Sequence, residues 1–133
     1  LVRLGFESRI GARIEPEVSL PAGGQGAVGI EYRADDERAA ALLAPLNHQS
    51  TSDCVVAERS VVRVLDGGCD VPIASYAVPE AEGFWLRALV GSVEGNSLLE
   101  AEARGSDPEA LGEQVAQTLL EKGAAAILEA VRG

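Results

Sequence analysis

Apolar residues in the middle of the chain first follow helical spacing. Residues 51–53 are polar and can cap a helix, and apolar side chains then recur on one face at Cys54, Ala57, Val61 and Leu65. Gly67 can adopt the left-handed conformation that ends a helix, and Pro72 prevents a restart soon afterwards. We therefore expect a helix that ends at about Leu65 or Asp66, followed by a loop that contains Cys69.

Three strand-like runs come next. Residues 71–78 favour a strand, and residues 84–93 place Phe84, Leu86, Ala88 and Val90 on one face. In residues 99–104, apolar and charged side chains alternate, although leucine, glutamate and alanine also favour helices. Turn-forming residues at 79–83 and 94–96 separate the runs, so the pattern predicts an antiparallel meander.

A final helix is predicted from Asp107 as the N-cap and Pro108 at the first helical position. Its apolar stripe continues past a weak point at Gly123 and comprises Leu111, Val115, Leu119, Ile127 and Val131. From about residue 47 onward, the order is helix, three strands, helix. This order predicts a small α+β domain with a three-stranded antiparallel sheet covered on one face by helices.

The first 46 residues lack such a continuous pattern. Residues 1–22 hold scattered apolar positions and two prolines, and we interpret them as the end of a unit that begins elsewhere. Residues 27–33 contain β-favouring Val, Ile and Tyr and predict a short β-segment. An alanine-rich helix is expected over Asp36–Leu43, closed by Pro45.

Gly24, Gly26 and Gly29 match GxGxxG letter for letter. That nucleotide-binding motif needs a buried strand before it and a helix that begins within it. Here Pro21 precedes the glycines and a β-favouring run follows them. The composition instead indicates a flexible or tightly turned crossing between two structural units.

Composition and charge narrow the function classes. The chain has 133 residues, 47% of them hydrophobic, which suffices for one domain plus part of another. It begins at Leu1 and has no methionine, so we expect a segment of a longer polypeptide. A formal charge of -10 argues against nucleic acid as a partner. No apolar run approaches the roughly 20 residues of a membrane span, and no signal sequence is recognisable.

The two cysteines, Cys54 and Cys69, lack CxxC spacing, so neither a zinc site nor a disulfide framework is implied, and a reduced cytosolic setting is expected. Cys54 lies on a predicted apolar stripe and reads as a core residue. Cys69 lies in Asp66-Gly67-Gly68-Cys69-Asp70, where flanking carboxylates disfavour the thiolate but the glycines leave room for a large group. From the residues alone, an ordinary loop cysteine and a covalent role both remain open.

For the remaining polar candidates, structural roles are favoured over catalytic ones. His48 is the only histidine and has no nucleophile near it in sequence, so a capping or surface role is favoured over general base catalysis. Glu58, Arg59 and Arg33 are interpreted as solvated or ion-paired surface groups.

Several stretches together resemble hydroxymethylbilane synthase, the porphobilinogen deaminase family. They are Leu20-Pro21-Ala22-Gly23-Gly24-Gln25-Gly26-Ala27-Val28-Gly29-Ile30-Glu31, Leu46-Asn47-His48, Ala57-Glu58-Arg59, and Leu65-Asp66-Gly67-Gly68-Cys69-Asp70-Val71-Pro72-Ile73. Arg3-Leu4-Gly5 and Trp85-Leu86-Arg87-Ala88-Leu89-Val90-Gly91 are similar to flanking segments of the same family. The likeness spans nearly the whole chain in the right order.

The resemblance implies three domains. Residues 1–22 would end the second, substrate-binding domain. Residues 23–46 would form the interdomain crossing plus a strand and a helix that return to the first domain, and residues 47–133 would form the C-terminal cofactor-attachment domain. The full-length enzyme would be a cytoplasmic monomer whose N-terminal domains precede this chain.

The resemblance also implies the chemistry. Cys69 matches the attachment residue for a covalent dipyrromethane cofactor, held by a thioether, with Gly68 beside it. Gln25 is expected to contact cofactor or substrate, with a hinge residue as the open alternative, and Arg3 matches an arginine that binds pyrrole carboxylates. The family joins four porphobilinogen units into hydroxymethylbilane with release of ammonia. Its catalytic aspartate lies in the preceding part, so no catalytic residue is expected here and the segment alone should be inactive.

A hypothesis of a different class is a non-catalytic α+β interaction module. In that case the meander and its helices would form a binding or dimerisation surface, and no pyrrole would be attached.

Overall fold

The computed structural model describes residues 1–66 and 71–132. Its centre is a three-stranded antiparallel sheet of β1 (Ile73–Glu80), β2 (Gly83–Gly91) and β3 (Leu98–Gly105), in the order β1-β2-β3. The predicted meander is confirmed, including its third run. The first strand begins two residues later than predicted and the second ends at Gly91.

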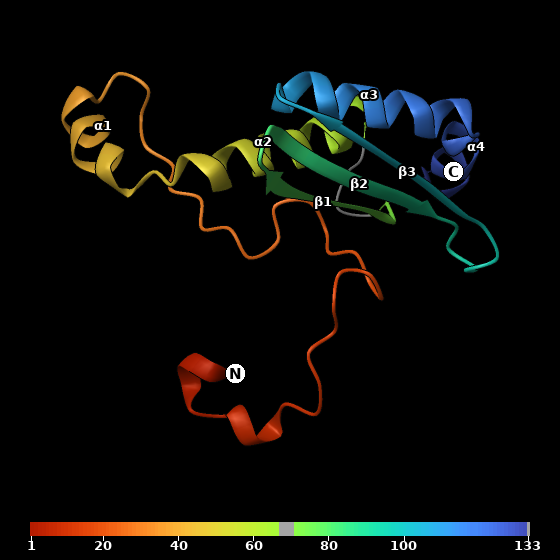
Figure 1. Ribbon diagram of the computed structural model, residues 1–133, viewed down its shortest axis with the longest axis horizontal. Coiled ribbons are helices and arrows are strands. Elements are labelled where there is room, and N and C mark those ends of the chain that lie inside the picture. Colours follow the sequence, from red (N-terminus) through yellow and green to blue (C-terminus); the bar gives the residue numbers. More distant parts are fainter. Residues whose placement is uncertain (67–70, 133) are drawn as a thin grey trace.

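Helices cover one face of the sheet, and the predicted α+β fold is confirmed (Figure 1). They are α2 (Gln49–Val64), α3 (Pro108–Glu121) and α4 (Ala124–Arg132). The start of α3 is as predicted, because the Asp107 side chain accepts a hydrogen bond from the Ala110 amide at 3.0 Å and Pro108 is the first helical residue.

The start of α2 differs from the prediction. His48 is the N-cap, and its Nδ1 accepts a hydrogen bond from the Thr51 amide at 3.4 Å. The predicted cap residues 51–53 lie inside the helix, where Gln49 donates a hydrogen bond to Asp53 at 2.7 Å. The capping role considered for His48 is confirmed. The helix ends at Val64, with Leu65 as its C-cap, close to the predicted position.

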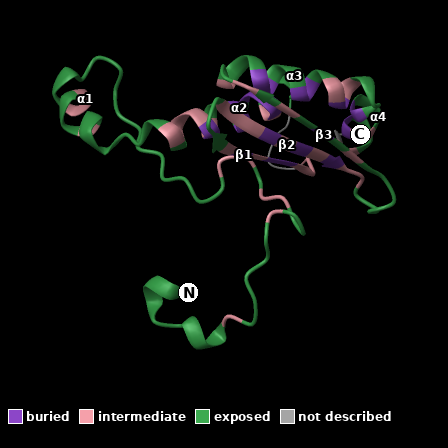
Figure 2. Cartoon of the chain, in the orientation of Figure 1, coloured by how far each residue is buried: buried purple, intermediate pink, exposed green. Residues whose placement is uncertain are grey.

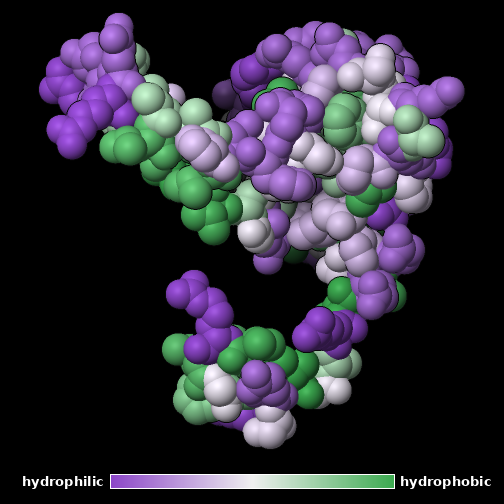
Figure 3. Space-filling model, turned by 60° about the vertical axis from the view of Figure 1, so that its left-hand side comes forward, coloured by the Kyte–Doolittle hydropathy of each residue, from purple (hydrophilic) through white to green (hydrophobic). Residues whose placement is uncertain are grey.

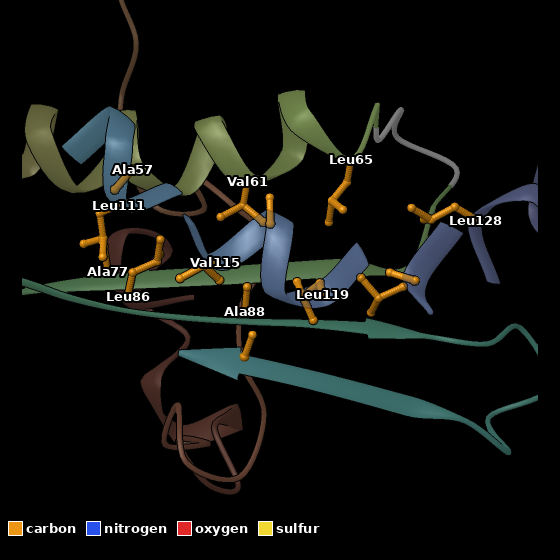
Figure 4. Packing of buried hydrophobic residues seen from close by; sticks show 14 of the residues in the cluster. Ala57, Val61, Leu65, Ala77, Leu86, Ala88, Leu111, Val115, Leu119 and Leu128 are labelled. Carbon is orange, nitrogen blue, oxygen red and sulfur yellow. The ribbon is translucent and has the colours of Figure 1, made fainter. Parts of the chain in front are cut away.

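The core lies between the helices and the sheet, where the labelled side chains of Figure 4 converge. Leu86, Ala88 and Val90 project from β2, and their exposed fractions are 1% or less. They meet apolar side chains of α2 and α3, namely Ala57, Val61, Leu111, Val115 and Leu119. The alternation predicted for β2 is therefore confirmed.

Two neighbouring helices approach each other closely at Gly112. A Cβ atom on this residue would clash with the Ser60 side chain and would lie 2.5 Å from the Ala57 carbonyl oxygen. Only glycine therefore allows α3 to pack this near to α2.

The apolar stripe of the last helix is shifted by one residue. Gly123 has φ +100°, a left-handed conformation that breaks the helix between α3 and α4. After this break Ala124 and Leu128 are buried, whereas the predicted Ile127 and Val131 are only half-buried. The prediction is therefore only partly right: Ile127 packs against the core, but the break changes the helical phase, so that Ala124 and Leu128 are the buried residues.

The sheet and the helices α2, α3 and α4 make up the C-terminal unit, which begins at residue 49. Residues 1–48 form an arm that extends away from this unit (Figure 1). The arm contains the short 3-10 helices η1 (Val2–Leu4), η2 (Glu7–Arg9) and η3 (Ala44–Leu46), and the helix α1 (Glu37–Leu43). The predicted helix is confirmed, with Asp36 as its N-cap.

The predicted β-segment at residues 27–33 is wrong, because this stretch is irregular. Its apolar residues favour a strand, but a strand also needs a partner to hydrogen-bond with. Most of the arm is exposed (Figure 2), and hydrophobic side chains gather on its separate N-terminal piece (Figure 3). The exposed large apolar residues of the whole arm are Leu1, Val2, Leu4, Phe6, Ile14, Val18, Val28, Ile30, Tyr32, Leu42 and Leu46.

Candidate functional site

The glycine-rich segment of the arm is a tight double turn. The amide of Gln25 donates to the Ala22 carbonyl at 3.0 Å, and the amide of Ala27 donates to the Gly24 carbonyl at 3.2 Å. Gly24 and Gly26 have φ values of +76° and +86°, which favour glycine. The tightly turned conformation predicted for this segment is therefore confirmed.

This turn lies against the seam between α2 and β1. The Pro21 carbonyl accepts a hydrogen bond from the Ser75 amide at 3.1 Å. A Cβ atom on Gly23 would lie 2.6 Å from the Ser75 hydroxyl and 3.4 Å from a methyl group of Val62. The absence of a side chain at Gly23 thus permits the close contact.

Glu58 joins the turn to the unit. Its side chain is on α2 and the residue is only 6% exposed. One carboxylate oxygen accepts the Gly24 amide at 2.6 Å, and the other accepts the Ala77 amide at 2.8 Å. Burial raises the pKa of Glu58, and the two amide hydrogen bonds offset part of this effect.

The interpretation of Glu58 as a surface group was wrong. A signal was present in the sequence, since Glu58 lies four residues after Cys54 and three before Val61, on the same helical face. The interpretation of Arg59 and Arg33 is confirmed, because both are exposed and Arg33 pairs with Asp35 at 2.9 Å.

Of the predicted site residues, Cys69 and Gly68 lie outside the described residues. On the helix side, Asp66 has φ +50°, so the chain leaves α2 in the left-handed conformation. Gln25 is exposed on the turn, where its side-chain oxygen accepts the Ala22 amide at 3.2 Å.

Arg3 is exposed in η1, at the N-terminal end of the arm, which lies apart from α2 and β1 in Figure 1. The structure therefore brings the turn that carries Gln25, but not Arg3, against the C-terminal unit.

Cys54 is a buried core residue, as predicted, with an exposed fraction of 8%. Burial raises the pKa of its thiol, and the negative charges of Glu58 and Asp53 raise it further. A thiol in this environment is a poor nucleophile.

The helix-free face of the sheet holds an arginine that the sequence analysis did not single out. The guanidinium of Arg87 lies 4.2 Å from the centroid of the Trp85 ring and pairs with Glu17 at 2.9 Å. Within the described part of the chain, its buried Nε has no hydrogen-bond partner. This ion pair is a second contact between the arm and the unit.

Among residues 1–66 and 71–132, no cluster of three or more His, Cys, Asp or Glu side chains is arranged to hold a metal ion. No helix in the same residues has the length and apolar character needed to cross a membrane.

Two family models match the chain. One describes the porphobilinogen deaminase C-terminal domain and matches residues 52–121, and the other describes the porphobilinogen deaminase dipyromethane cofactor binding domain and matches residues 1–41. The chain belongs to the porphobilinogen deaminase family. Its role therefore lies in tetrapyrrole biosynthesis, with dipyrromethane as the cofactor. The resemblance to hydroxymethylbilane synthase is confirmed.

The two matched regions meet in this porphobilinogen deaminase chain through the contacts described above. Glu58 belongs to the C-terminal match, whereas Gly24 and Gln25 belong to the cofactor-binding match. The hydrogen bond from Gly24 to Glu58 thus links residues of both regions.

Proposed function

We propose that the chain forms the C-terminal part of an enzyme that joins four porphobilinogen units into hydroxymethylbilane, with one ammonia released per unit. The observation that supports this proposal is the match of both porphobilinogen deaminase regions, in order, along one chain. Residues 1–22, 23–46 and 47–133 would belong to the second domain, the crossing with its return to the first domain, and the third domain.

Cys69 is the proposed attachment residue, and Gly68, which has no side chain, precedes it in the sequence. In attachment, the Cys69 sulfur would form a bond to the aminomethyl carbon of a pyrrole as the carbon–nitrogen bond breaks, and the thiol proton would leave with the ammonia. Because the pyrrole would be the electrophile, the thiol must be held in the right position but does not have to be ionised in advance. Carboxylates at Asp66 and Asp70 disfavour the thiolate, and a thiol that need not be ionised is compatible with them. When bound, dipyrromethane supplies the pyrrole end on which the chain grows.

Two further residues are proposed to contact the bound pyrroles. The Gln25 side-chain oxygen accepts the Ala22 amide, so its side-chain nitrogen is the group that would donate to a pyrrole carboxylate. The guanidinium of Arg3 suits the planar carboxylates of porphobilinogen. This role would require the N-terminal piece to approach the C-terminal unit in the full-length enzyme.

The arm supports the assignment to a larger enzyme. Its apolar side chains are exposed, as expected for surfaces that pack against other domains. If the resemblance holds for the whole enzyme, the family's catalytic aspartate and most of its carboxylate-binding arginines would precede residue 1. We therefore expect the 133-residue chain alone to release no ammonia from porphobilinogen.

Intact-mass spectrometry of the full-length enzyme tests the attachment residue. The wild-type protein should carry a dipyrromethane adduct, which peptide mapping should locate at Cys69. Cys69→Ser should fold but lack the adduct, whereas the matched control Cys54→Ser, which alters the buried thiol, should retain it. An unmodified Cys69 in every wild-type preparation, or an adduct retained in Cys69→Ser, would contradict the proposal.

An acidic aldehyde reagent for pyrroles separates this function from the interaction module. The wild-type enzyme should give the pyrrole colour after denaturation, whereas a module would give none.

A further inference from the structure

A single buried carboxylate binds backbone amides from two distant parts of the chain. Gly24 lies 34 residues before Glu58, and Ala77 lies 19 residues after it. A buried carboxylate is costly unless hydrogen bonds satisfy it, and each oxygen of Glu58 accepts one short bond. The arrangement therefore depends on all three partners being in place.

The edge of the sheet explains why the amide of Ala77 needs this partner. β1 is an edge strand, and its register with β2 leaves the amides of Ser75 and Ala77 pointing away from the sheet. The Pro21 carbonyl accepts the first of these amides, and Glu58 accepts the second. The turn and the carboxylate together thus cover the outer edge of β1.

Further contacts hold the same residues together. The Ser75 hydroxyl donates to the backbone carbonyl of Glu58 at 3.2 Å, which ties β1 to α2. Gly23 lies against both elements, at a distance that leaves no space for a side chain. The turn therefore packs on a surface that α2 and β1 form jointly.

We propose that Glu58 is a positioning residue that fastens the turn Pro21–Gly26 to α2 and β1. Through this clasp, Gln25 moves with the C-terminal unit, while the parts of the arm outside residues 17–26 can change their position. α2 and β1 are also the two elements that flank the segment with Cys69. The clasp would thus hold Gln25 in a fixed relation to the cofactor-bearing unit while the pyrrole chain grows. Only this last consequence rests on the proposed function.

Amide hydrogen exchange in the full-length enzyme tests the clasp directly. In Glu58→Ala, exchange at Gly24 and Ala77 should accelerate by at least about tenfold, the effect expected for loss of a hydrogen bond to a charged group. Because β2 is the central strand and its amides hydrogen-bond to β1 or to β3, these amides should keep their rates. The matched control Glu113→Gln, which alters a carboxylate that is 57% exposed on α3, should change none of these amides.

A second variant keeps the test decisive if Glu58→Ala does not fold. Glu58→Gln is nearly isosteric but has one acceptor oxygen, so it can satisfy only one of the two amides well. Faster exchange at Gly24 or Ala77, confined to the turn and the β1 edge, supports the clasp. Unchanged exchange at both amides, or a uniform acceleration across the sheet, overturns it.

Kinetics of the full-length enzyme test the coupling to Gln25. If Glu58 acts through the turn, Glu58→Gln and Gln25→Ala should change the KM for porphobilinogen non-additively, while the mass of the Cys69 adduct stays the same. Additive effects would overturn the coupling. A wild-type enzyme without any adduct would refute the proposed function, but the exchange result would still stand by itself.

Discussion

The C-terminal unit and the N-terminal arm both contain large apolar residues, but the unit buries them and the arm exposes most of them. Every buried hydrophobic residue of the described chain lies between Cys54 and Leu128. Most of the exposed large apolar side chains lie in residues 1–46. The unit encloses its apolar residues between a sheet and helices, whereas the arm has one short α-helix, three 3-10 turns and no partner layer. Apolar content therefore becomes a core only where a second layer covers it.

The border between the two regions lies within the arm. Glu17 pairs with Arg87, Pro21 bonds to Ser75, and Gly24 bonds to Glu58. These contacts hold residues 17–24 against the unit, although the residues precede it in sequence by more than 20 positions. If this border is sharp, substitutions on its two sides should have very different effects.

The largest difference is expected for leucines in the two regions. Leu86 is fully buried, and its cross-strand neighbours are Ala77 and Ala103. Leu86→Ala should leave a cavity that small neighbours cannot fill, and should lower the free energy of unfolding by about 2–5 kcal/mol. Urea denaturation followed by circular dichroism would measure the change.

The matched variant in the arm is Leu42→Ala. Leu42 lies on α1 and is 68% exposed, so its truncation removes few contacts in this chain. We expect a change within about 0.5 kcal/mol. Equal losses for the two leucines would abolish the distinction between unit and arm.

A smaller effect is expected for glycines. Gly112→Ala introduces a methyl group where α3 meets Ser60 and Ala57, and the helices must separate to accept it. The cost should be about 1–3 kcal/mol in urea denaturation. Gly29→Ala is the control in the arm, because a Cβ there meets no atom within 4 Å. If Gly112→Ala were tolerated as well as Gly29→Ala, the close helix contact would be wrong.

The same contrast explains what the sequence could predict. Between residues 49 and 132, each local pattern has its partner within the same stretch, so alternation and helical spacing gave the correct elements. In residues 27–33 the β-favouring side chains are present, but no strand among residues 1–66 and 71–132 pairs with them. The phase of α4 was mispredicted because a left-handed Gly123 rotates everything after it.

The candidate site was only partly predictable for a related reason. The turn at Gly24 could be expected from glycine alone. The roles of Glu58 and Arg87 depend on partners that are 34 and 70 residues distant in sequence. No local pattern encodes such distant pairs, and charged residues are normally assigned to the surface.

The contribution of Glu58 to stability should depend on pH. Because burial raises the pKa of Glu58 above its ordinary value of 4.5, the folded state holds this proton more tightly than the unfolded state. The contribution of Glu58 to stability is therefore complete below pH 4.5 and is lost as the pH rises through the folded-state pKa. Glu58→Gln cannot titrate.

Unfolding of both proteins in urea at a series of pH values would measure this effect. The stability of the wild type relative to Glu58→Gln should fall as the pH increases. A wild type that gains stability over the variant with increasing pH would indicate that the amide hydrogen bonds outweigh burial.

The smallest effect is expected where the arm crosses the open face of the sheet. The pKa of Glu17 is lowered by a hydrogen bond to its own backbone and by the Arg87 guanidinium. Because Glu17 is exposed, its attraction to Arg87 is screened by salt. Glu17→Gln should therefore detach this part of the arm and leave the unit folded. Trp85, the only tryptophan, stacks on Arg87 and can report the change through acrylamide quenching of its fluorescence.

Quenching should increase in Glu17→Gln and remain at the wild-type level in Glu15→Gln, which changes a nearby exposed carboxylate. Salt should raise quenching in the wild type but have little effect in Glu17→Gln, because the ion pair is already absent there. Equal salt responses in the two proteins would mean that Glu17 does not hold the arm to the sheet. Residues 21–24 would then be the first point at which the arm joins the unit.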